Sequence, residues 1–334
     1  MSKTYLGIDV HKLRCVYTEL NTKGKIVRKG SFGNNIEEVS DFASSLKGLE
    51  ELVLEPVLNY LWLLDHFEPY VHSVHVATPY KVRIIAESKC KTDKYDSRIL
   101  AELLRVNFLP ESWIPPVELR SFRNIIRQRH RLVKTTVMYK NYIRHLLFLH
   151  GIALKVSNIA SAKARREIKR LYLPETTRQS VEQCLQVIGN LGEMINVLDD
   201  QIELQSANNE TIELLKTIPG IGQLWAATIY GEVGDINRFS SAKAFASYTG
   251  LVPSVRSSGE SSHYGGITHQ GSCPLRNALV EAAIRTIRKS PPLNRMYHRI
   301  VYRSNSQKAR VAVARKLAVI IYKMLKNKEP FRTE

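Results

Sequence analysis

The stretch TYLGIDVHK, residues 4–12, decides the fold, because it carries an apolar run that ends on a carboxylate. Residues 4–10 have the length and composition of a short buried strand, and Asp9 lies where such a strand reaches the edge of its sheet. Taken alone, an acid at a strand end is most often solvated or caps the next turn. Its meaning depends on what the rest of the chain places beside it.

The segments after this strand predict a mixed α/β domain. Gly48 is suited to ending a helix, and Pro56 is suited to opening one. The first three strands are expected to be antiparallel and joined by hairpins. The expected strands lie at residues 4–10, 15–20, 26–34, 52–54 and 73–79, and the expected helices at residues 35–48, 57–67 and 91–106, the last with apolar positions Ile99, Leu100, Leu103 and Leu104.

Four acids are candidates for a single cluster in this domain. Asp9 and Glu55 end two strands, while Asp93 and Asp96 lie three residues apart on one face of a helix start. Singly, Glu55 fits a cap and the helical pair fits the helix dipole. Together, clustered carboxylates repel one another unless cations bind among them, and two Mg²⁺ ions about 4 Å apart can promote attack at a phosphodiester. This combination, in a strand order that resembles the ribonuclease H fold, favours a metal site.

The charge of the chain indicates a polyanionic partner. The 334 residues carry 49 Lys+Arg against 31 Asp+Glu, a formal net charge of +18, so nucleic acid is the expected ligand. A basic surface without a ligand is the alternative. The cysteines are far apart and form no CxxC, which predicts neither a zinc site nor disulfides. With no signal peptide and no apolar stretch of bilayer length, we expect a cytoplasmic protein without membrane contact. The cysteines are Cys15, Cys90, Cys184 and Cys273.

Residues 117–149 predict a long helix with one apolar and one basic face. The segment has eight Lys/Arg against one Glu, a bias that favours a polyanion over mixed surface pairs. A second basic stretch, KARREIKR, occupies residues 163–170. The expected core positions are Leu119, Phe122, Ile126, Val133 and Val137, and the expected nucleic-acid contacts are Arg123, Arg127, Arg131 and Lys134.

A heptad repeat follows the basic segments. Its seven-residue spacing favours a two-stranded coiled coil and hence dimerisation, and antiparallel pairing with the preceding helix of the same chain is nearly as well supported. The repeat runs through Val181, Ile188, Ile195 and Ile202, with Cys184, Leu191 and Leu198 three positions later.

Two motifs mark the last third of the chain. PGIG, residues 219–222, resembles the turn of a helix-hairpin-helix, in which backbone N–H groups of Gly220 and Gly222 would hold a phosphate; a tight helix–helix turn is the alternative. A loop rich in Ser and Gly then leads into a helix, for which Ser272 is the expected N-cap.

These motifs resemble the insertion sequence 110 family of DEDD transposases, which is related to the pilin-gene invertases. The resemblance lies in YLGIDVHK, LEP, KTDKYDSRILAELL and GLVPS…SSG…GGIT…G…LR…LVEAA, and it covers most of the chain. It implies a RuvC-like catalytic domain over residues 1–115, a helical coiled-coil segment over residues 116–208, and a mostly α transposase domain over residues 209–330. The family's four acids fall on Asp9, Glu55, Asp93 and Asp96.

The resemblance also implies a reaction. The nucleophilic serine of the family falls in SSG, at Ser258 or alternatively Ser257, and its attack on a DNA phosphate would leave a phosphoserine and a free 3′-hydroxyl. Arg256 and Arg276 are candidates for stabilising phosphate charge. One departure occurs after GGIT, where His269 and Gln270 stand in place of a basic residue.

By the same resemblance, the expected protein is a recombinase that uses Mg²⁺ or Mn²⁺ and acts on element ends and target DNA. A structured guide RNA and a homo-oligomer, dimer or tetramer, are its expected partners. Three alternatives stay open: a RuvC-type nuclease that cuts branched DNA without rejoining it, an ATPase of the actin type, and an architectural nucleic-acid binder. The ATPase would need further Gly-rich phosphate loops, which the sequence lacks, and the architectural binder has no use for four clustered acids.

Overall fold

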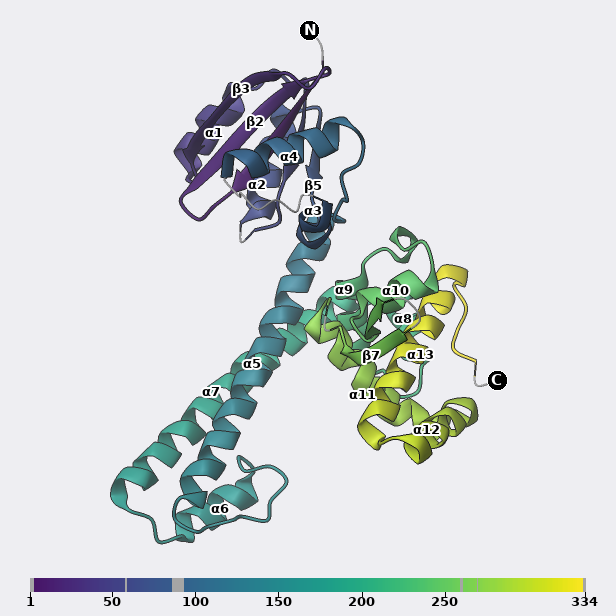
Figure 1. The fold of residues 1–334 in the computed structure, drawn as a ribbon. Helices are drawn as coiled ribbons and strands as arrows, with labels where there is room; N and C mark the ends of the chain where they lie inside the picture. The colour runs from purple at the N-terminus through teal and green to yellow at the C-terminus, as the bar shows by residue number, and fades with distance from the viewer. Residues whose placement is uncertain (1–2, 58, 86–92, 259–260, 269, 333–334) are drawn as a thin grey trace. The chain divides into compact units, whose positions relative to one another are not determined.

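The computed structural model describes residues 3–332, apart from residues 58, 86–92, 259–260 and 269; the side chains of residues 93–95, 255–258 and 261–264 also lie outside the description. Contacts divide the chain into two units, Met1–Ile114 and Pro115–Glu334. No helix in the described ranges is long and apolar enough to cross a membrane. Each unit is described by itself below (Figure 1).

The first unit is built on a five-stranded sheet of order β3-β2-β1-β4-β5. β1, β2 and β3 are antiparallel neighbours, whereas β4 and β5 run parallel to β1. This confirms the predicted α/β class and the strand order of the ribonuclease H fold. The elements are β1 (Thr4–Val10), β2 (Arg14–Asn21), β3 (Ile26–Gly33), α1 (Ile36–Ser44), β4 (Glu50–Leu54), α2 (Tyr60–Phe67), η1 (Glu68–Tyr70), β5 (Ser73–Val76), α3 (Pro79–Ile85) and α4 (Asp93–Arg105).

Two helix boundaries differ from those expected. α1 ends at Ser44, four residues before Gly48, because the backbone N–H groups of Ser45 and Leu46 already close its last turn. α2 begins at Tyr60 and not directly after Pro56, since Asn59 is its N-cap. Gly48 and Pro56 therefore lie in the connections between strands and helices and not at the helix ends.

Alternate residues of β1 pack on opposite faces of the sheet. Leu6 and Ile8 belong to a core that α1 and α2 close, with Val39, Phe42 and Phe67. The other face holds Val53 of β4 and is covered by α4, through Leu100, Leu103 and Leu104. These α4 positions are among those predicted from the sequence. The strand period of two thus sends Tyr5, Gly7 and Asp9 toward the α4 face.

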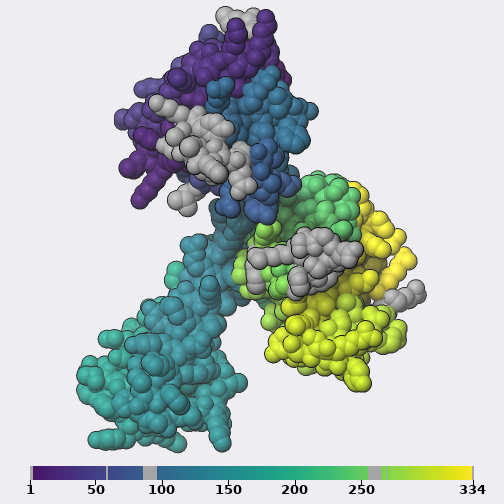
Figure 2. Space-filling model, viewed as in Figure 1, coloured from purple at the N-terminus to yellow at the C-terminus, as the bar shows by residue number. Residues whose placement is uncertain are grey.

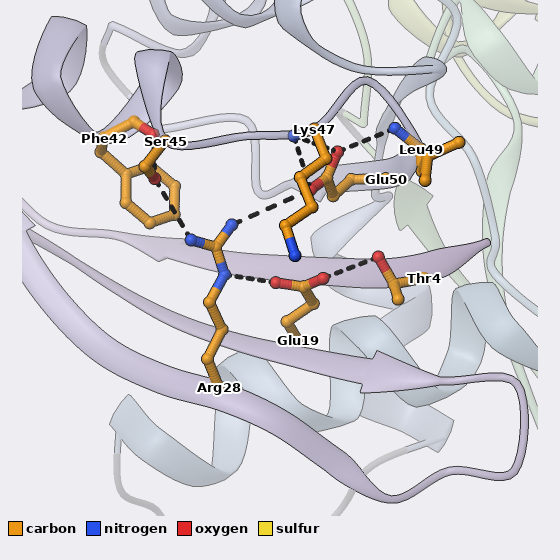
Figure 3. Close-up of polar contacts among 8 residues, drawn as sticks. All are labelled: Thr4, Glu19, Arg28, Phe42, Ser45, Lys47, Leu49 and Glu50. Carbon is orange, nitrogen blue, oxygen red and sulfur yellow. Dashed lines mark hydrogen bonds and ion pairs between the residues drawn. The ribbon is translucent and has the colours of Figure 1, made fainter. Parts of the chain in front are cut away.

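A polar network closes the amino ends of the central strands (Figure 3). The buried Glu19 carboxylate pairs with Arg28 and accepts a hydrogen bond from Thr4 Oγ1 at 2.7 Å. The buried Glu50 carboxylate accepts hydrogen bonds from the backbone N–H groups of Lys47 and Leu49, both at 3.0 Å. The two buried acids at this end are therefore matched by donors, as buried charge requires.

The second unit consists of a long helical hairpin and a mostly helical domain that carries one β-hairpin. Its elements are α5 (Val117–Phe148), α6 (Ala162–Arg170), α7 (Glu175–Ser206), α8 (Glu210–Lys216), α9 (Gln223–Val233), η2 (Ile236–Arg238), α10 (Ala242–Tyr248), β6 (Pro253–Ser258), β7 (Ser261–Ile267), α11 (Cys273–Lys289), α12 (Pro291–Arg303) and α13 (Ser306–Asn327).

The heptad repeat of α7 pairs with α5 of the same chain. Val181, Cys184 and Ile188 pack in one core with Ile143 and Leu147. Arg129 in the first half of α5 pairs with Asp199 in the second half of α7, whereas Ile143 and Leu147 contact the first half of α7, so the two helices are antiparallel. The sequence left two pairings open, and the structure shows the antiparallel pairing within one chain. The heptad positions of α7 therefore pack against α5 without a second copy of the protein.

The apolar face of α5 follows the predicted stripe for its first three turns. Leu119, Phe122 and Ile126 are buried, but Val137 is 49% exposed. The prediction for Val137 is wrong because the contact of α5 changes along its length, from α9 at its start to α6 and α7 at its end.

Candidate active site

Asp9 and Glu55 lie side by side at the carboxyl ends of neighbouring parallel strands. Ile8 of β1 is in register with Leu54 of β4, so the next residue on each strand is an acid. Asp9 is buried, with 6% of its surface exposed, and Glu55 is half-buried. Asp9 alternates with Ile8 and so is on the α4 face, and Glu55 directly follows the last residue of β4. We call this pair of strand ends the acid edge.

α4 brings its first turn to the same edge. Gly7 permits this, because a Cβ at position 7 would lie 2.1 Å from the Ser97 carbonyl oxygen and 2.6 Å from the Ala101 nitrogen. Ser97 Oγ also lies 2.9 Å from Thr18 Oγ1 of β2, the residue paired with Gly7. The GID sequence is thus a close-packing glycine followed, two positions later, by an acid.

The direction of α4 places its N-terminal acids at the same end of the sheet as Asp9 and Glu55. Its last residue, Arg105, donates a hydrogen bond from Nη1 to the Thr22 carbonyl at 3.2 Å, near the amino end of β1. α4 is therefore antiparallel to β1, and its first turn lies toward the acid edge. Asp96 directly precedes Ser97 and is half-buried. Asp93 is the first residue of α4, and its side chain lies outside the described residues.

The acids are suited to a divalent cation by their chemistry. Carboxylate oxygens are the ligands that Mg²⁺ and Mn²⁺ prefer, and here they come from two strand ends and one helix start. Among the described side chains, no three His, Cys, Asp or Glu residues are close enough together to hold a metal ion. Asp9, Glu55 and Asp96 are in that set, so the structure does not bring these three carboxylates within range of one ion, and Asp93 lies outside the set.

His11 is a neighbour of the site that the sequence analysis missed. Its Nε2 atom lies 3.1 Å from Oδ2 of Asp9, and its side chain is 42% exposed. The available signal was the spacing of two in DVH, which puts both side chains on one side of an extended chain. His11 can orient the Asp9 carboxylate from the solvent side.

Cys15 lies behind the acid edge as a neutral thiol. Burial raises the pKa of the Cys15 thiol to about 12, and the negative charge of Asp9 adds to the shift. Cys15 pairs with Val10 in the β1–β2 ladder and belongs to the core that α1 and α2 close. It is therefore a packing residue and not a nucleophile.

The segment that contains the candidate serines is a β-hairpin and not the loop that was expected. β6 and β7 pair antiparallel, with Ser257 opposite Ser262 and Ser258 opposite Ser261. The backbone places both candidate serines at the closed end of the hairpin. Their side chains and that of Arg256 lie outside the described residues, as does His269.

The helix that follows the hairpin begins as predicted. Ser272 Oγ accepts a hydrogen bond from the Leu275 N–H at 3.2 Å, which confirms Ser272 as the N-cap of α11. Arg276, one turn further on, donates weakly from Nη1 to the Thr249 carbonyl at 3.4 Å. Arg276 is half-buried and lies beside Gly250.

Two of the arginines nominated for nucleic acid are held by the protein itself. Arg127 forms a two-pronged salt bridge with the buried Glu232 of α9, at 2.8 and 2.9 Å. Arg123 donates to the Gly231 carbonyl at 2.9 Å, and burial lowers the pKa of its guanidinium. These contacts join α5 to α9. Further along α5, Arg131 and Lys134 are exposed.

The two glycines of PGIG have different surroundings. Gly220 has φ +100°, and a Cβ there would lie 2.5 Å from Arg285 Cβ of α11, so this glycine serves close packing. Thr286 Oγ1 binds the Pro219 carbonyl at 2.6 Å from the same helix. Gly222 is the N-cap of α9, and a Cβ there would meet open space. Only the Gly222 side of the turn is open.

The fold and the site together define the class: a ribonuclease H-like domain with an acid edge, followed by a mostly helical region. Two family models match the chain and between them cover more than half of it. A model of DEDD transposases of the IS110 type matches residues 6–151, and one described as "Transposase IS116/IS110/IS902 family" matches residues 212–298.

Relatives along the whole chain agree with these models. The transposase for insertion sequence element IS1111A of Coxiella burnetii is 29% identical, over 72% of this chain and 68% of the relative. The pilin gene-inverting proteins of Moraxella bovis and Moraxella lacunata are 26% and 27% identical, each over 99% of this chain and 98% of the relative. The chain belongs to the IS110 family of transposases. The DEDD domain indicates dependence on a divalent metal.

Proposed function

We propose that this protein cleaves and rejoins DNA at the ends of a mobile element, with Ser258 as nucleophile and the acid edge as metal-dependent activator. The observation that carries the proposal is the register of β1 and β4, which places Asp9 beside Glu55 under the first turn of α4. Asp93 and Asp96 complete the proposed ligand set. Mg²⁺ is the proposed ion, with Mn²⁺ as its substitute.

In the proposed reaction, Ser258 Oγ attacks a DNA phosphorus while its hydroxyl proton leaves to a base. The bond between phosphorus and the 3′-oxygen breaks, and the released 3′-oxygen takes up a proton. The 5′-phosphate stays on the serine as a phosphodiester, which conserves the energy of the broken bond for rejoining. A divalent cation, when bound, supplies Lewis-acid stabilisation of phosphate charge. Arg256 and Arg276 are proposed to bind that phosphate, and His11 to orient the Asp9 carboxylate.

Ser258 and Ser257 are separate candidates for the nucleophile. They occupy successive positions of β6, and successive strand positions face opposite sides of a ribbon. We therefore expect that only one of the two serine substitutions abolishes the covalent intermediate. Ser258 is the proposed nucleophile, and Ser257 is the alternative.

The proposed partners follow from charge and from the family. A net charge of +18 supports binding of element and target DNA, together with a structured guide RNA. Arg131, Lys134 and the open side of Gly222 are the proposed nucleic-acid contacts outside the acid edge. The proposed assembly is a homo-oligomer, dimer or tetramer, in the cytoplasm.

The test is a recombination assay with purified protein, Mg²⁺, co-purifying RNA, and DNA that carries element ends and target. Wild type is compared with Asp9→Ala, Ser258→Ala and Ser257→Ala, and protein–DNA adducts are scored on a denaturing gel. We expect an adduct in wild type and Ser257→Ala, and none in Asp9→Ala or Ser258→Ala. Metal-dependent cutting with no adduct in any protein would overturn the proposal and favour the RuvC-type nuclease.

A further inference from the structure

The short helix α6 closes the end of the α5–α7 hairpin and has two different faces. Ala164 and Ile168 are buried against the hairpin core, and Ser161 caps the helix through the Ala164 N–H at 3.2 Å. This end of the hairpin lies about 33 Å along α5 from the contact of Ile126 with α9. The outward face is basic, and α6 lies in the teal part of the chain at the end of the hairpin (Figure 2). Its exposed cations are Lys163, Arg166, Lys169 and Arg170.

The cations around α6 divide into two groups by their contacts. Arg165 donates to the Leu185 carbonyl at 3.1 Å, and Arg178 donates to the Leu171 carbonyl at 2.7 Å. Both therefore hold α6 and its connection against α7. Within the described part of the chain, Arg166, Lys169 and Arg170 form no salt bridge, and they face solvent.

An aromatic ring projects beside these cations. Tyr172 is 96% exposed, whereas Leu173, the next residue, is buried in the hairpin core. The Tyr172 ring contributes almost no buried area to the fold, so packing does not account for it. Exposed aromatic rings beside Lys and Arg are the devices with which proteins stack the bases and neutralise the phosphates of single strands.

A cavity of about 520 Å³ lies between α6 and the first half of α7. Its lining includes the apolar side chains of Ile168, Leu173 and Val181, the cations of Arg166 and Lys169, and one acid, Glu182. Its volume is within the range of pockets that take ligands the size of a nucleotide. Charge, an exposed ring and an apolar recess thus occur together on one surface.

We propose that this surface, made of Arg166, Lys169, Arg170, Tyr172 and the adjoining cavity, binds single-stranded nucleic acid. Tyr172 stacks on a base, and the three cations hold the neighbouring phosphates. The shared chemistry is an unpaired nucleotide strand, which either the guide RNA or an opened DNA strand supplies. The site is distinct from the acid edge and the serine hairpin, and its function does not require cleavage.

The experiment uses the full-length protein without Mg²⁺ and three fluorescent probes of one sequence: single-stranded RNA, single-stranded DNA and duplex DNA. Affinity is measured by anisotropy at several salt concentrations. Probes with a photoreactive uracil are also cross-linked, and the attached residue is mapped by mass spectrometry. Mapping is needed because a chain of this charge binds nucleic acid at other surfaces.

We expect cross-links at Tyr172 with single strands and not with the duplex. Tyr172→Ala should weaken single-strand binding about tenfold, and Tyr172→Phe should bind like wild type, because stacking requires the ring only. Replacing Arg166, Lys169 and Arg170 by Gln should lower the salt slope by about 2. The preferred single strand identifies the source of the ligand.

The controls separate this site from general basicity and from catalysis. Tyr302 on α12 is 93% exposed, so Tyr302→Ala removes an equally exposed ring elsewhere and should leave the affinity unchanged. Because the binding assay contains no Mg²⁺, its outcome does not depend on whether the proposed cleavage chemistry is right. Equal affinities of wild type and Tyr172→Ala, with cross-links only outside residues 160–186, would overturn the proposal.

Discussion

The two ends of the five-stranded sheet hold their acids in different ways. At the amino ends of β1 and β4, the buried Glu19 and Glu50 are met by donors: Arg28, Thr4 and two backbone N–H groups (Figure 3). At the carboxyl ends, Asp9 and Glu55 follow two residues that are in register, Ile8 and Leu54, and the start of α4 lies toward the same end of the sheet. At the amino ends each buried acid has donors from the protein, whereas at the carboxyl ends Asp9 has His11 at 3.1 Å and Glu55 directly follows β4.

This difference separates acids that stabilise the fold from acids that we propose bind a metal ion. In the proposed metal site, neighbouring carboxylates repel one another until a cation binds, so removing one of them should cost little stability. The matched acids have the opposite property, because their removal leaves buried donors without acceptors. Substitutions at the two ends should therefore affect different measurements.

The largest effect on activity is expected when the acid at one end of β4 is replaced by its amide and compared with the same replacement at the other end. Glu55→Gln should reduce DNA cleavage about 1,000-fold, because a carboxylate of the proposed metal site is lost, without lowering thermal stability. Glu50→Gln, the matched control on the same strand, should retain cleavage at 25 °C and lower the free energy of unfolding by about 1–3 kcal/mol. Cleavage rates and urea unfolding check both. Equal losses of activity in the two variants would contradict the distinction.

The second prediction concerns the packing that holds α4 against the acid edge. Gly7→Ala should lower the free energy of unfolding of the first unit by about 3 kcal/mol, since its Cβ would meet backbone atoms of Ser97 and Ala101. Cleavage should fall with it as the first turn of α4 moves. Thermal unfolding measures the change.

Gly192→Ala is the control for the glycine prediction. Gly192 lies inside α7, where a Cβ would meet open space, so alanine should raise helix stability by up to about 1 kcal/mol. A shift of the same sign in both variants would show that Gly7 does not mark a close contact.

The sequence predicts the strands of the sheet and the acids at their ends better than it predicts what the charged helices contact. Alternation along residues 4–33 identifies the antiparallel strands, and acids at strand ends are visible because a parallel sheet aligns its carboxyl ends. The β6–β7 hairpin was missed, since its Ser- and Gly-rich strands show no apolar alternation. The heptad of α7 is compatible with a partner helix from the same chain or from a second copy, and only the three-dimensional packing identifies α5 as that partner.

The basic face of α5 shows the same limit at the level of single residues. Arg127 and Arg131 are one turn apart and look alike in the sequence. Arg127 binds Glu232, which follows it by 105 positions, and Arg131 does not. A helical pattern reports which side of a helix a residue is on, but not which distant element covers that side. His11 and Cys15 were likewise recognised only through their contacts with Asp9.

The third prediction extends the comparison to this helix, where Glu232 is a buried acid of the matched kind. Arg127→Met should lower the free energy of unfolding by about 2 kcal/mol, because it leaves the fully buried Glu232 carboxylate without its two-pronged partner while the exposed half of Arg127 contributes little. Arg131→Met is the matched control and should change stability by less than about 0.5 kcal/mol. Its effect should instead appear as weaker DNA binding. An equal loss of stability in the two variants would contradict this prediction, because Arg127 would then behave like the solvent-exposed Arg131.

The smallest effect concerns the thiol behind the acid edge. Because burial raises the pKa of Cys15 to about 12, its thiolate is only about one part in 10,000 at pH 8, and alkylation of the folded protein should be very slow there. The exposed Cys273 should react first, and Cys184 should stay protected by burial, which also raises the pKa of that thiol. A Cys90→Ser background leaves these three thiols for mass spectrometry with iodoacetamide. Asp9→Asn should leave Cys15 slow, since burial is the larger cause of its shift and the carboxylate the smaller. If Cys15 instead reacts as fast as Cys273, the β1–β2 end opens in solution, and the acid edge is then not the preformed arrangement that the sheet register implies.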